Sequence, residues 1–152
     1  MLSENMVISQ SMPIETFSVE SRPEALKQIR EKVRTDLEKI HFPAAEIDKI
    51  LVAVGEACTN SICHAYEGRP EGRIDITIEI EADRVLFRIR DYGKKMDLSK
   101  VKIPKLPPEK PHGLGIYFMK TMMDEFEYNG AHPQGNEVIL VKYRKPEGNQ
   151  PR

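Results

Sequence analysis

Cysteine is scarce in this sequence, and its scarcity excludes two kinds of cross-link. Only Cys58 and Cys63 occur, in one apolar helical pattern that places them on different faces of a helix, so they form no disulfide framework. A zinc site needs more soft ligands than these two thiols and the nearby His64 supply. We therefore expect reduced cysteines that pack in a core, and a cytoplasmic location.

Long apolar runs and an excess of one charge are also missing. No stretch approaches the roughly 20 apolar residues of a membrane-spanning helix. Residues 1–12 contain no lysine or arginine and no long apolar run, which is unlike a secretion signal. The 23 basic and 24 acidic residues leave a net charge of -1, so no long-range field attracts nucleic acid or an anionic membrane. We expect a soluble protein that binds neither.

The 152 residues suffice for one domain with a sizeable core. We predict a single domain over residues 1–152, with an ordered part from about 14 to 145. Helical patterns run from about 23 to 40, 44 to 66 and 113 to 125, and strand patterns cover 16–19, 74–80, 85–90, 126–128 and 138–143.

The strand patterns at 74–80 and 85–90 alternate apolar and polar residues. Such alternation buries one face of a sheet and leaves the other largely polar, unlike the doubly covered parallel sheet of dinucleotide-binding folds. The predicted fold class is therefore α+β, a two-layer sandwich with a mixed, mostly antiparallel sheet and helices on one face.

Three polar residues are spaced four apart in the second helical pattern. Glu56, Asn60 and His64 form a polar strip that lies beside the buried face of that helix. A carboxamide oxygen is a hard ligand for magnesium and a carboxylate accepts protons, so the first two residues suit phosphoryl chemistry. The same spacing is also typical of a solvated helix face, and the strip alone does not decide between the two.

An Asp-x-Gly motif ends the apolar strand pattern at 85–90. Asp91 can accept a hydrogen bond from an amine such as that of adenine, and Gly93 lets the backbone approach a base closely. The same residues are also plain loop chemistry.

A second glycine motif follows a long loop. Residues 98–112 contain four prolines and four lysines and have the length usual for lids and binding surfaces. Gly113, Leu114 and Gly115 then open a helix, whose unpaired N–H groups suit a phosphate. A flexible loop exit is the alternative.

The order of these motifs resembles a known superfamily. A polar helix motif, a strand-end Asp-x-Gly, a long loop and a Gly-x-Gly helix start occur together in the histidine kinase-like (GHKL) ATPases. These include gyrase, ATP-driven chaperones, mismatch-repair ATPases and histidine kinases, and share the Bergerat-type fold. The resemblance runs from about Arg22 to Tyr143. Within it, the string from Glu56 to Tyr66, EACTNSICHAY, is similar to that of bacterial anti-sigma-factor serine/threonine kinases.

This resemblance implies roles for individual residues. Glu56 would be the general base, Asn60 the ligand of Mg²⁺, and residues 98–112 the ATP lid. The ATP-binding positions that it implies are Asn60, His64, Asp91, Gly93, Met96, Lys110, His112, Gly113, Leu114 and Gly115. Two positions depart from the pattern, because Lys95 stands where a glycine is usual and Asn136 where a threonine is usual.

The resemblance also implies an activity and partners. The protein would use Mg-ATP to phosphorylate a serine or threonine of an anti-sigma-factor antagonist with a STAS-type domain. It would also bind a sigma factor and form a homodimer. Two alternatives stand beside this hypothesis. A nucleotide-gated module that sequesters its client with little transferase activity is motivated by Lys95, Asn136 and the lack of an arginine before Gly113. A detached histidine-kinase catalytic domain would instead phosphorylate histidine in a separate chain.

Overall fold

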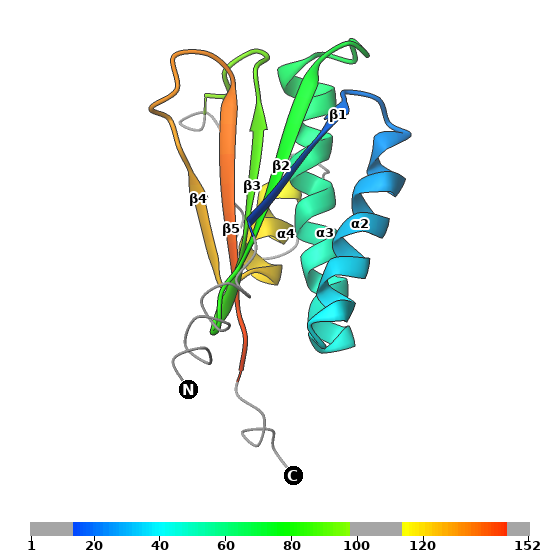
Figure 1. Ribbon diagram of the computed structural model, residues 1–152. Helices are drawn as coiled ribbons and strands as arrows, with labels where there is room; N and C mark the ends of the chain where they lie inside the picture. Colours follow the sequence, from blue (N-terminus) through cyan, green and yellow to red (C-terminus); the bar gives the residue numbers. More distant parts are fainter. Residues whose placement is uncertain (1–13, 98–113, 146–152) are drawn as a thin grey trace, which may run out of the picture.

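The computed structural model describes residues 14–97 and 114–145, which form a sheet with helices on one face (Figure 1). The helices are α2 (Ala25–Lys39), α3 (Ala44–Asn60), the π-helix η1 (Ser61–Ala65) and α4 (Leu114–Met122). The strands are β1 (Ile14–Glu20), β2 (Arg73–Ile80), β3 (Arg84–Asp91), β4 (Glu125–Tyr128) and β5 (Asn136–Tyr143). The predicted α+β class is confirmed.

The sheet has five strands in the order β1-β2-β3-β5-β4 within the described ranges. Each of these neighbouring pairs is antiparallel, so this part of the sheet is not mixed as the sequence suggested. In the β3–β5 register, Asp91 lies opposite Asn136. The last residue of β3 therefore lies opposite the first residue of β5, at the end of these two strands where the Asp-x-Gly motif begins.

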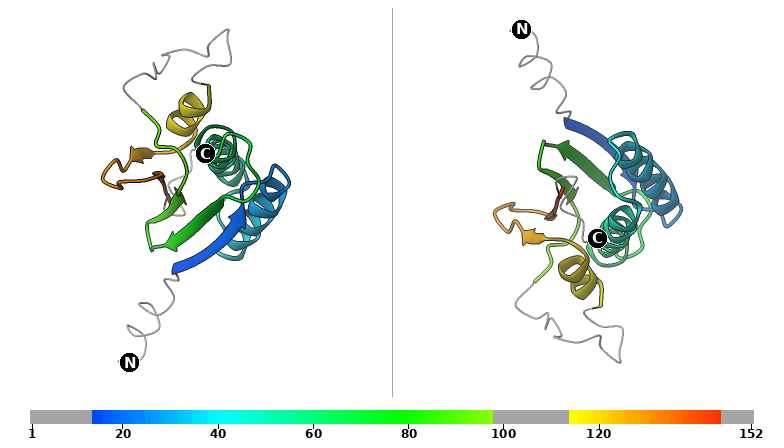
Figure 2. Two further views of the ribbon diagram at one scale, coloured as in Figure 1. Left: turned by 90° about the horizontal axis from the view of Figure 1, so that it is seen from above. Right: turned by 90° about the horizontal axis from the view of Figure 1, so that it is seen from below.

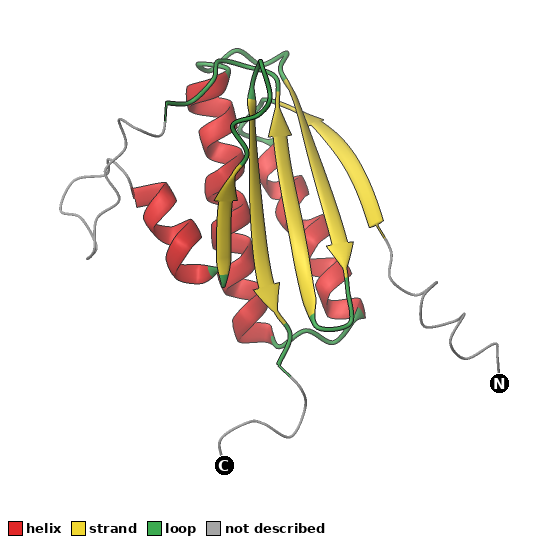
Figure 3. Ribbon diagram, turned by 90° about the vertical axis from the view of Figure 1, so that its left-hand side faces the viewer, coloured by secondary structure: helices red, strands yellow, loops and turns green. Residues whose placement is uncertain are grey.

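The two layers are separated by an apolar core. Views along the strands show α2 and α3 side by side on one face of the sheet, with α4 next to α3 (Figure 2). The opposite face of the sheet carries no helix among the described residues (Figure 3). Residues at i, i+4 and i+8 of α2, namely Ile29, Val33 and Leu37, are fully buried, as their spacing predicts. Alternate residues of β2 and β3 meet them from the sheet.

One buried charge joins three elements at the end of the core away from the glycine motifs. Lys142 of β5 is only 6% exposed, and its Nζ lies 3.3 Å from a carboxylate oxygen of Glu46 in the first turn of α3. The same ammonium donates a 2.8 Å hydrogen bond to the carbonyl oxygen of Met122, the last residue of α4. This ammonium satisfies an otherwise free helix-end carbonyl and fixes α4 relative to α3.

The helical segment that begins with α3 changes its hydrogen-bonding pattern after Asn60. The sequence predicts one α-helix to about Tyr66, but the α-helix ends at Asn60 and a π-helical turn follows. The Tyr66 N–H accordingly bonds to the carbonyl oxygen of Ser61, five residues back. The α-helical spacing therefore holds for Glu56 and Asn60 but not for His64, which lies in the π turn with an exposed side chain.

Among the residues that the structure describes, none of the helices is both long and apolar enough to span a bilayer.

Candidate functional site

The N-terminal turn of α4 lies against the polar strip of α3. A Cβ atom placed on Gly115 would lie 3.1 Å from Glu56 Oε2 and 3.6 Å from Asn60 Oδ1. The carboxylate and the carboxamide thus lie together under the first turn of α4, and the missing side chain of Gly115 leaves room for them. The sequence predicted the Glu56–Asn60 pair and Gly115 in two separate motifs, and the structure brings them together.

The Asp-x-Gly motif packs against the π turn through its glycine. A Cβ atom on Gly93 would lie 2.4 Å from the carbonyl oxygen of Ala65, a distance at which the backbone would have to move. That same carbonyl accepts a 2.7 Å hydrogen bond from the N–H of Lys94. Glycine is needed here because two backbone segments touch directly, so the motif is more than a flexible loop.

Asp91 is buried and held by four hydrogen bonds. Its carboxylate Oδ2 accepts a 2.7 Å bond from the Ser61 hydroxyl. Its Oδ1 accepts bonds from the Gly93 N–H at 3.2 Å, and from the N–H and Nδ2 of Asn136 at 3.1 and 3.0 Å. Oδ1 is therefore fully engaged, whereas Oδ2 has one partner in the described residues and retains acceptor capacity for a ligand amine.

Asn136 is a site residue that the sequence flagged only as a departure from the family pattern. Its side chain is buried, and its Oδ1 accepts bonds from the N–H of Met96 and the hydroxyl of Tyr128, both at 2.7 Å. Its Nδ2 donates to the carbonyl oxygen of Lys94 at 2.9 Å as well as to Asp91. Asn136 thus connects Asp91 with the backbone of residues 94–96.

The tyrosine of the Ala-Tyr pair after His64 supports the motif from the opposite side. The Tyr66 hydroxyl accepts a 2.7 Å bond from the Tyr92 N–H and donates a 2.5 Å bond to the carbonyl oxygen of Arg73. Burial of the phenol raises the pKa of Tyr66, so the hydroxyl stays protonated and keeps donating. Tyr66 is therefore a structural support, a role that the sequence motif did not predict.

The middle residue of the Asp-x-Gly motif lies on the other face of the sheet. Tyr92 donates a 2.6 Å hydrogen bond from its hydroxyl to Asp75 Oδ2, and its ring lies under the guanidinium of Arg90, with Arg90 Cζ 4.4 Å from the ring centroid. The side chains of Asp91 and Tyr92 therefore point to opposite faces, as successive strand residues do. Only Asp91 belongs to the site.

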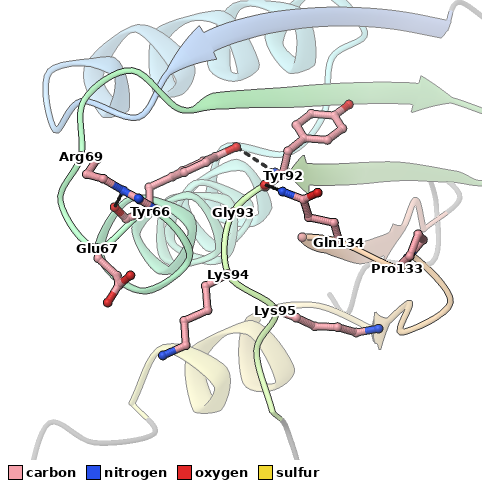
Figure 4. Close-up of a pocket in the computed structure, with 10 residues that line it drawn as sticks. Tyr66, Glu67, Arg69, Tyr92, Gly93, Lys94, Lys95, Pro133 and Gln134 are labelled. Carbon is pink, nitrogen blue, oxygen red and sulfur yellow. Dashed lines mark hydrogen bonds between the residues drawn. The ribbon is translucent and has the colours of Figure 1, made fainter.

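A surface pocket of about 430 Å³ lies next to the motif (Figure 4). The residues that line it are Tyr66, Glu67, Arg69, Tyr92, Gly93, Lys94, Lys95, Pro133, Gln134 and Gly135. Figure 4 shows Tyr66 and Gln134 both hydrogen-bonded to the backbone of Tyr92. Neither Glu56 nor Asn60, the pair that suits phosphoryl chemistry, lines this pocket. The pocket is therefore separate from the place where those two residues meet Gly115.

Some predicted site residues lie outside the described ranges. These are Lys110, His112 and Gly113, together with the rest of the predicted lid at 98–112. Leu114 is the first residue of α4, and Met96 enters the site through its backbone N–H, which Asn136 holds. His64 is exposed in the π turn.

The donor set fits a magnesium ion bound together with phosphates. Within the described residues, no group of three or more histidine, cysteine or acidic side chains is placed to hold a metal by itself. Mg²⁺ at kinase sites typically takes one or two protein oxygens and completes its shell with phosphates and water. The carboxamide oxygen of Asn60, next to Glu56 and the first turn of α4, is suited to such a shared site.

Comparison with known proteins places the chain in a family. Residues 19–142 match the family model described as the histidine kinase-like ATPase domain. The chain belongs to this family of ATP-binding domains, which confirms the resemblance of its motifs.

Similar curated proteins carry more specific names. The chain is 30% identical over 135 residues to the serine-protein kinase RsbW of Oceanobacillus iheyensis, covering 84% of each chain. It is 36% identical over 101 residues to the anti-sigma F factor of Clostridium beijerinckii, covering 64% of this chain and 71% of that protein.

Among solved structures, the RsbU and RsbW domains of a Mycobacterium tuberculosis protein match with a TM-score of 0.66 at 17% identity. The match covers 88% of this chain and 33% of that one. A mycobacterial sensor histidine kinase, MprB, matches with a TM-score of 0.51 at 13% identity, covering 87% and 99% of the two chains. These two matches bear on the fold alone.

Proposed function

We infer that this protein is an anti-sigma factor with ATP-dependent serine kinase activity, which phosphorylates an anti-sigma-factor antagonist. The observation that carries this inference is the packing of Gly115 against Glu56 and Asn60. A proton acceptor, a magnesium ligand and a helix N-terminus suited to phosphates lie together there. The buried carboxylate of Asp91 serves the adenine base. The names of the similar curated proteins support the same activity.

The chemistry at the phosphate end follows from the three adjacent groups. Glu56 accepts the proton of the substrate serine hydroxyl as the serine oxygen bonds to the terminal phosphorus and ADP leaves with the electrons of the broken P–O bond. Asn60 would hold Mg²⁺, which would neutralise phosphate charge. The first turn of α4, where Gly115 brings the backbone close, presents N–H groups to the phosphates. Positioning and charge neutralisation supply most of the catalysis.

The base end selects adenine through one carboxylate oxygen. Asp91 Oδ2 accepts from the exocyclic amine, because Oδ1 already takes three donors from Gly93 and Asn136. The Ser61 hydroxyl, 2.7 Å from Oδ2, fixes the direction of the remaining acceptor. The Gly93 N–H bonds to this carboxylate directly, and the Met96 N–H is connected to it through the side chain of Asn136.

The partners proposed for the protein are a STAS-type antagonist, which receives the phosphoryl group, and a sigma factor, which is bound without being phosphorylated. Competition between them would couple the sigma factor's release to the antagonist's phosphorylation state. A cytoplasmic homodimer is the proposed form. These proposals rest on the family, and size-exclusion chromatography with light scattering tests the dimer directly.

A phosphotransfer assay tests the function. The protein is incubated with Mg-ATP labelled at the terminal phosphate and a panel of antagonist domains, and products are separated after acid treatment. Acid-stable phosphoserine on an antagonist is the expected result. Confirmed ATP binding with no labelled antagonist would favour a nucleotide-gated sequestering module instead. An acid-labile product would favour a detached histidine-kinase domain.

A further inference from the structure

The two residues that depart from the family pattern, Lys95 and Asn136, hold the same short stretch of backbone. Lys95 Nζ donates hydrogen bonds to the carbonyl oxygens of Gly130 and His132, at 2.7 and 2.8 Å, in the turn between β4 and β5. Asn136, at the start of β5, bonds to the N–H of Met96 and the carbonyl oxygen of Lys94. With the bond from the Tyr128 hydroxyl of β4 to the Met96 carbonyl oxygen at 3.4 Å, five side-chain hydrogen bonds therefore join residues 94–96 to the β4–β5 hairpin.

Asn136 also contacts the carboxylate proposed to recognise the base. Its Nδ2 donates to Asp91 Oδ1 at 3.0 Å, and its backbone N–H donates to the same oxygen at 3.1 Å. A carboxamide has two donor hydrogens and an acceptor oxygen, so it can bond Asp91, Lys94 and Met96 simultaneously. A threonine hydroxyl has one donor hydrogen and cannot donate to both Asp91 and Lys94.

The hydrogen-bond partners of Asn136 determine which atom of its amide is the oxygen. The backbone N–H of Met96 is a donor only, so the atom facing it must be an acceptor, and the Lys94 carbonyl is an acceptor only, so the atom facing it must be a donor. Tyr128 of β4 is a further partner, since its hydroxyl donates to the same Oδ1 at 2.7 Å. Every polar atom of the buried amide is thereby paired, which fixes its orientation.

We propose that Asn136 is a positioning residue for adenine selectivity, which holds Asp91 and the Met96 backbone at a fixed separation, and that Lys95 supports it by holding the hairpin. The proposal rests on the proposed ATP site. Fixed spacing matters because guanine presents a carbonyl oxygen where adenine presents its amine, and an immobile carboxylate rejects that oxygen. A looser Asp91 loses part of the rejection as well as part of the affinity for ATP.

Nucleotide titrations of the full chain test this proposal. Dissociation constants for ATP and GTP are measured by calorimetry on the wild type, Asn136→Thr, Lys95→Met and the double variant. Lys27→Met, an exposed lysine of α2, is the matched control for the lysine change. We expect Asn136→Thr to weaken ATP binding roughly 3- to 10-fold, the worth of a hydrogen bond, and to weaken GTP binding less, so that the ATP/GTP preference falls. Lys95→Met should lower the ATP/GTP preference about 2-fold, because the hydrogen bonds of Lys95 are exposed.

The double variant separates positioning from general destabilisation. Because both side chains hold residues 94–96, its loss of preference should be smaller than the product of the two single losses. Thermal unfolding of each variant checks folding. If Asn136→Thr does not fold, Tyr128→Phe, which removes one bond to the same amide oxygen, takes its place with the same expected direction.

The outcomes distinguish this proposal from the proposed function. A wild type that does not bind ATP, or one whose ATP affinity is unchanged by Asp91→Asn, would refute the nucleotide site itself. Normal ATP binding that depends on Asp91, with an unchanged ATP/GTP preference in the folded variants, would refute the positioning role of Asn136 alone.

Discussion

The Ser61 hydroxyl donates a 2.7 Å hydrogen bond to Asp91 Oδ2, and this bond joins the start of the π turn to the end of β3. The two residues are far apart in the sequence and both are almost completely buried. Their contact places the helix that carries Glu56 and Asn60 in fixed relation to the carboxylate proposed for the base.

Asp91→Asn should keep the fold and weaken ATP binding roughly 10- to 100-fold, the range of a hydrogen bond to a charged group. The asparagine oxygen can still accept from Gly93 and Asn136, while its Nδ2 meets the Ser61 oxygen. That nitrogen would then face the adenine amine with a donor, so the base loses its acceptor. Calorimetric titration with ATP measures the effect, and Asp83→Asn in the exposed β2–β3 turn is the control. An unchanged dissociation constant for ATP would show that the adenine base binds elsewhere.

Glu56→Gln should lower phosphotransfer about 10²- to 10⁴-fold while leaving ATP binding near that of the wild type. The amide keeps the size of the side chain under Gly115 but cannot accept the serine proton. Single-turnover transfer to the antagonist measures the rate, and Glu31→Gln on the exposed side of α2 is the matched control. Turnover equal to that of the wild type would rule out Glu56 as the general base.

Gly115→Ala should slow phosphotransfer about 10- to 100-fold in a protein that still folds. The added methyl group would lie 3.1 Å from Glu56 Oε2, so the carboxylate must shift by a few tenths of an ångström. Gly130→Ala is the control, since its methyl group would make only ordinary contacts, 3.6 Å from the Tyr128 ring. Equal rates for the two variants would show that the first turn of α4 does not constrain Glu56.

The two cysteines should react very differently with thiol reagents. Burial raises the pKa of the Cys58 thiol to about 12, whereas Cys63 is exposed. Because the thiolate is the reactive form, iodoacetamide at pH 8 should label only Cys63 in the native protein and both cysteines in urea. Mass spectrometry of the peptides checks this, and rapid native labelling of Cys58 would contradict its burial.

The raised pKa of Cys58 also sets a direction for stability at high pH. The unfolded thiol ionises near 9.0 while the folded one stays protonated until about 12. The free energy of unfolding should therefore fall as pH rises through this window. Cys58→Ala should show a smaller fall, measurable by urea titrations at pH 8 and pH 10.

The pattern of residues along the chain predicted most of the helices and strands, and three motifs predicted which residues form the candidate site. The period of the apolar residues predicted α2, α3 and the β2–β3 hairpin, because burial of one face requires that period. Three motifs could be recognised from the sequence because each needs a residue type with few substitutes. These are the carboxylate of Glu56 at a core edge, the acceptor Asp91 at a strand end and Gly115 at a helix start.

The contacts between these elements depend on tertiary packing, which the order of residues along the chain does not reveal. The π turn after Asn60 packs against Gly93, whose backbone contacts Ala65, and no local periodicity encodes such a contact. Asn136 appeared in the sequence as a mere departure, since a hydrogen-bonded amide is recognisable only when the register places it opposite Asp91. Local spacing thus specifies which groups a helix or strand carries, whereas the partners of those groups come from chain segments tens of residues away.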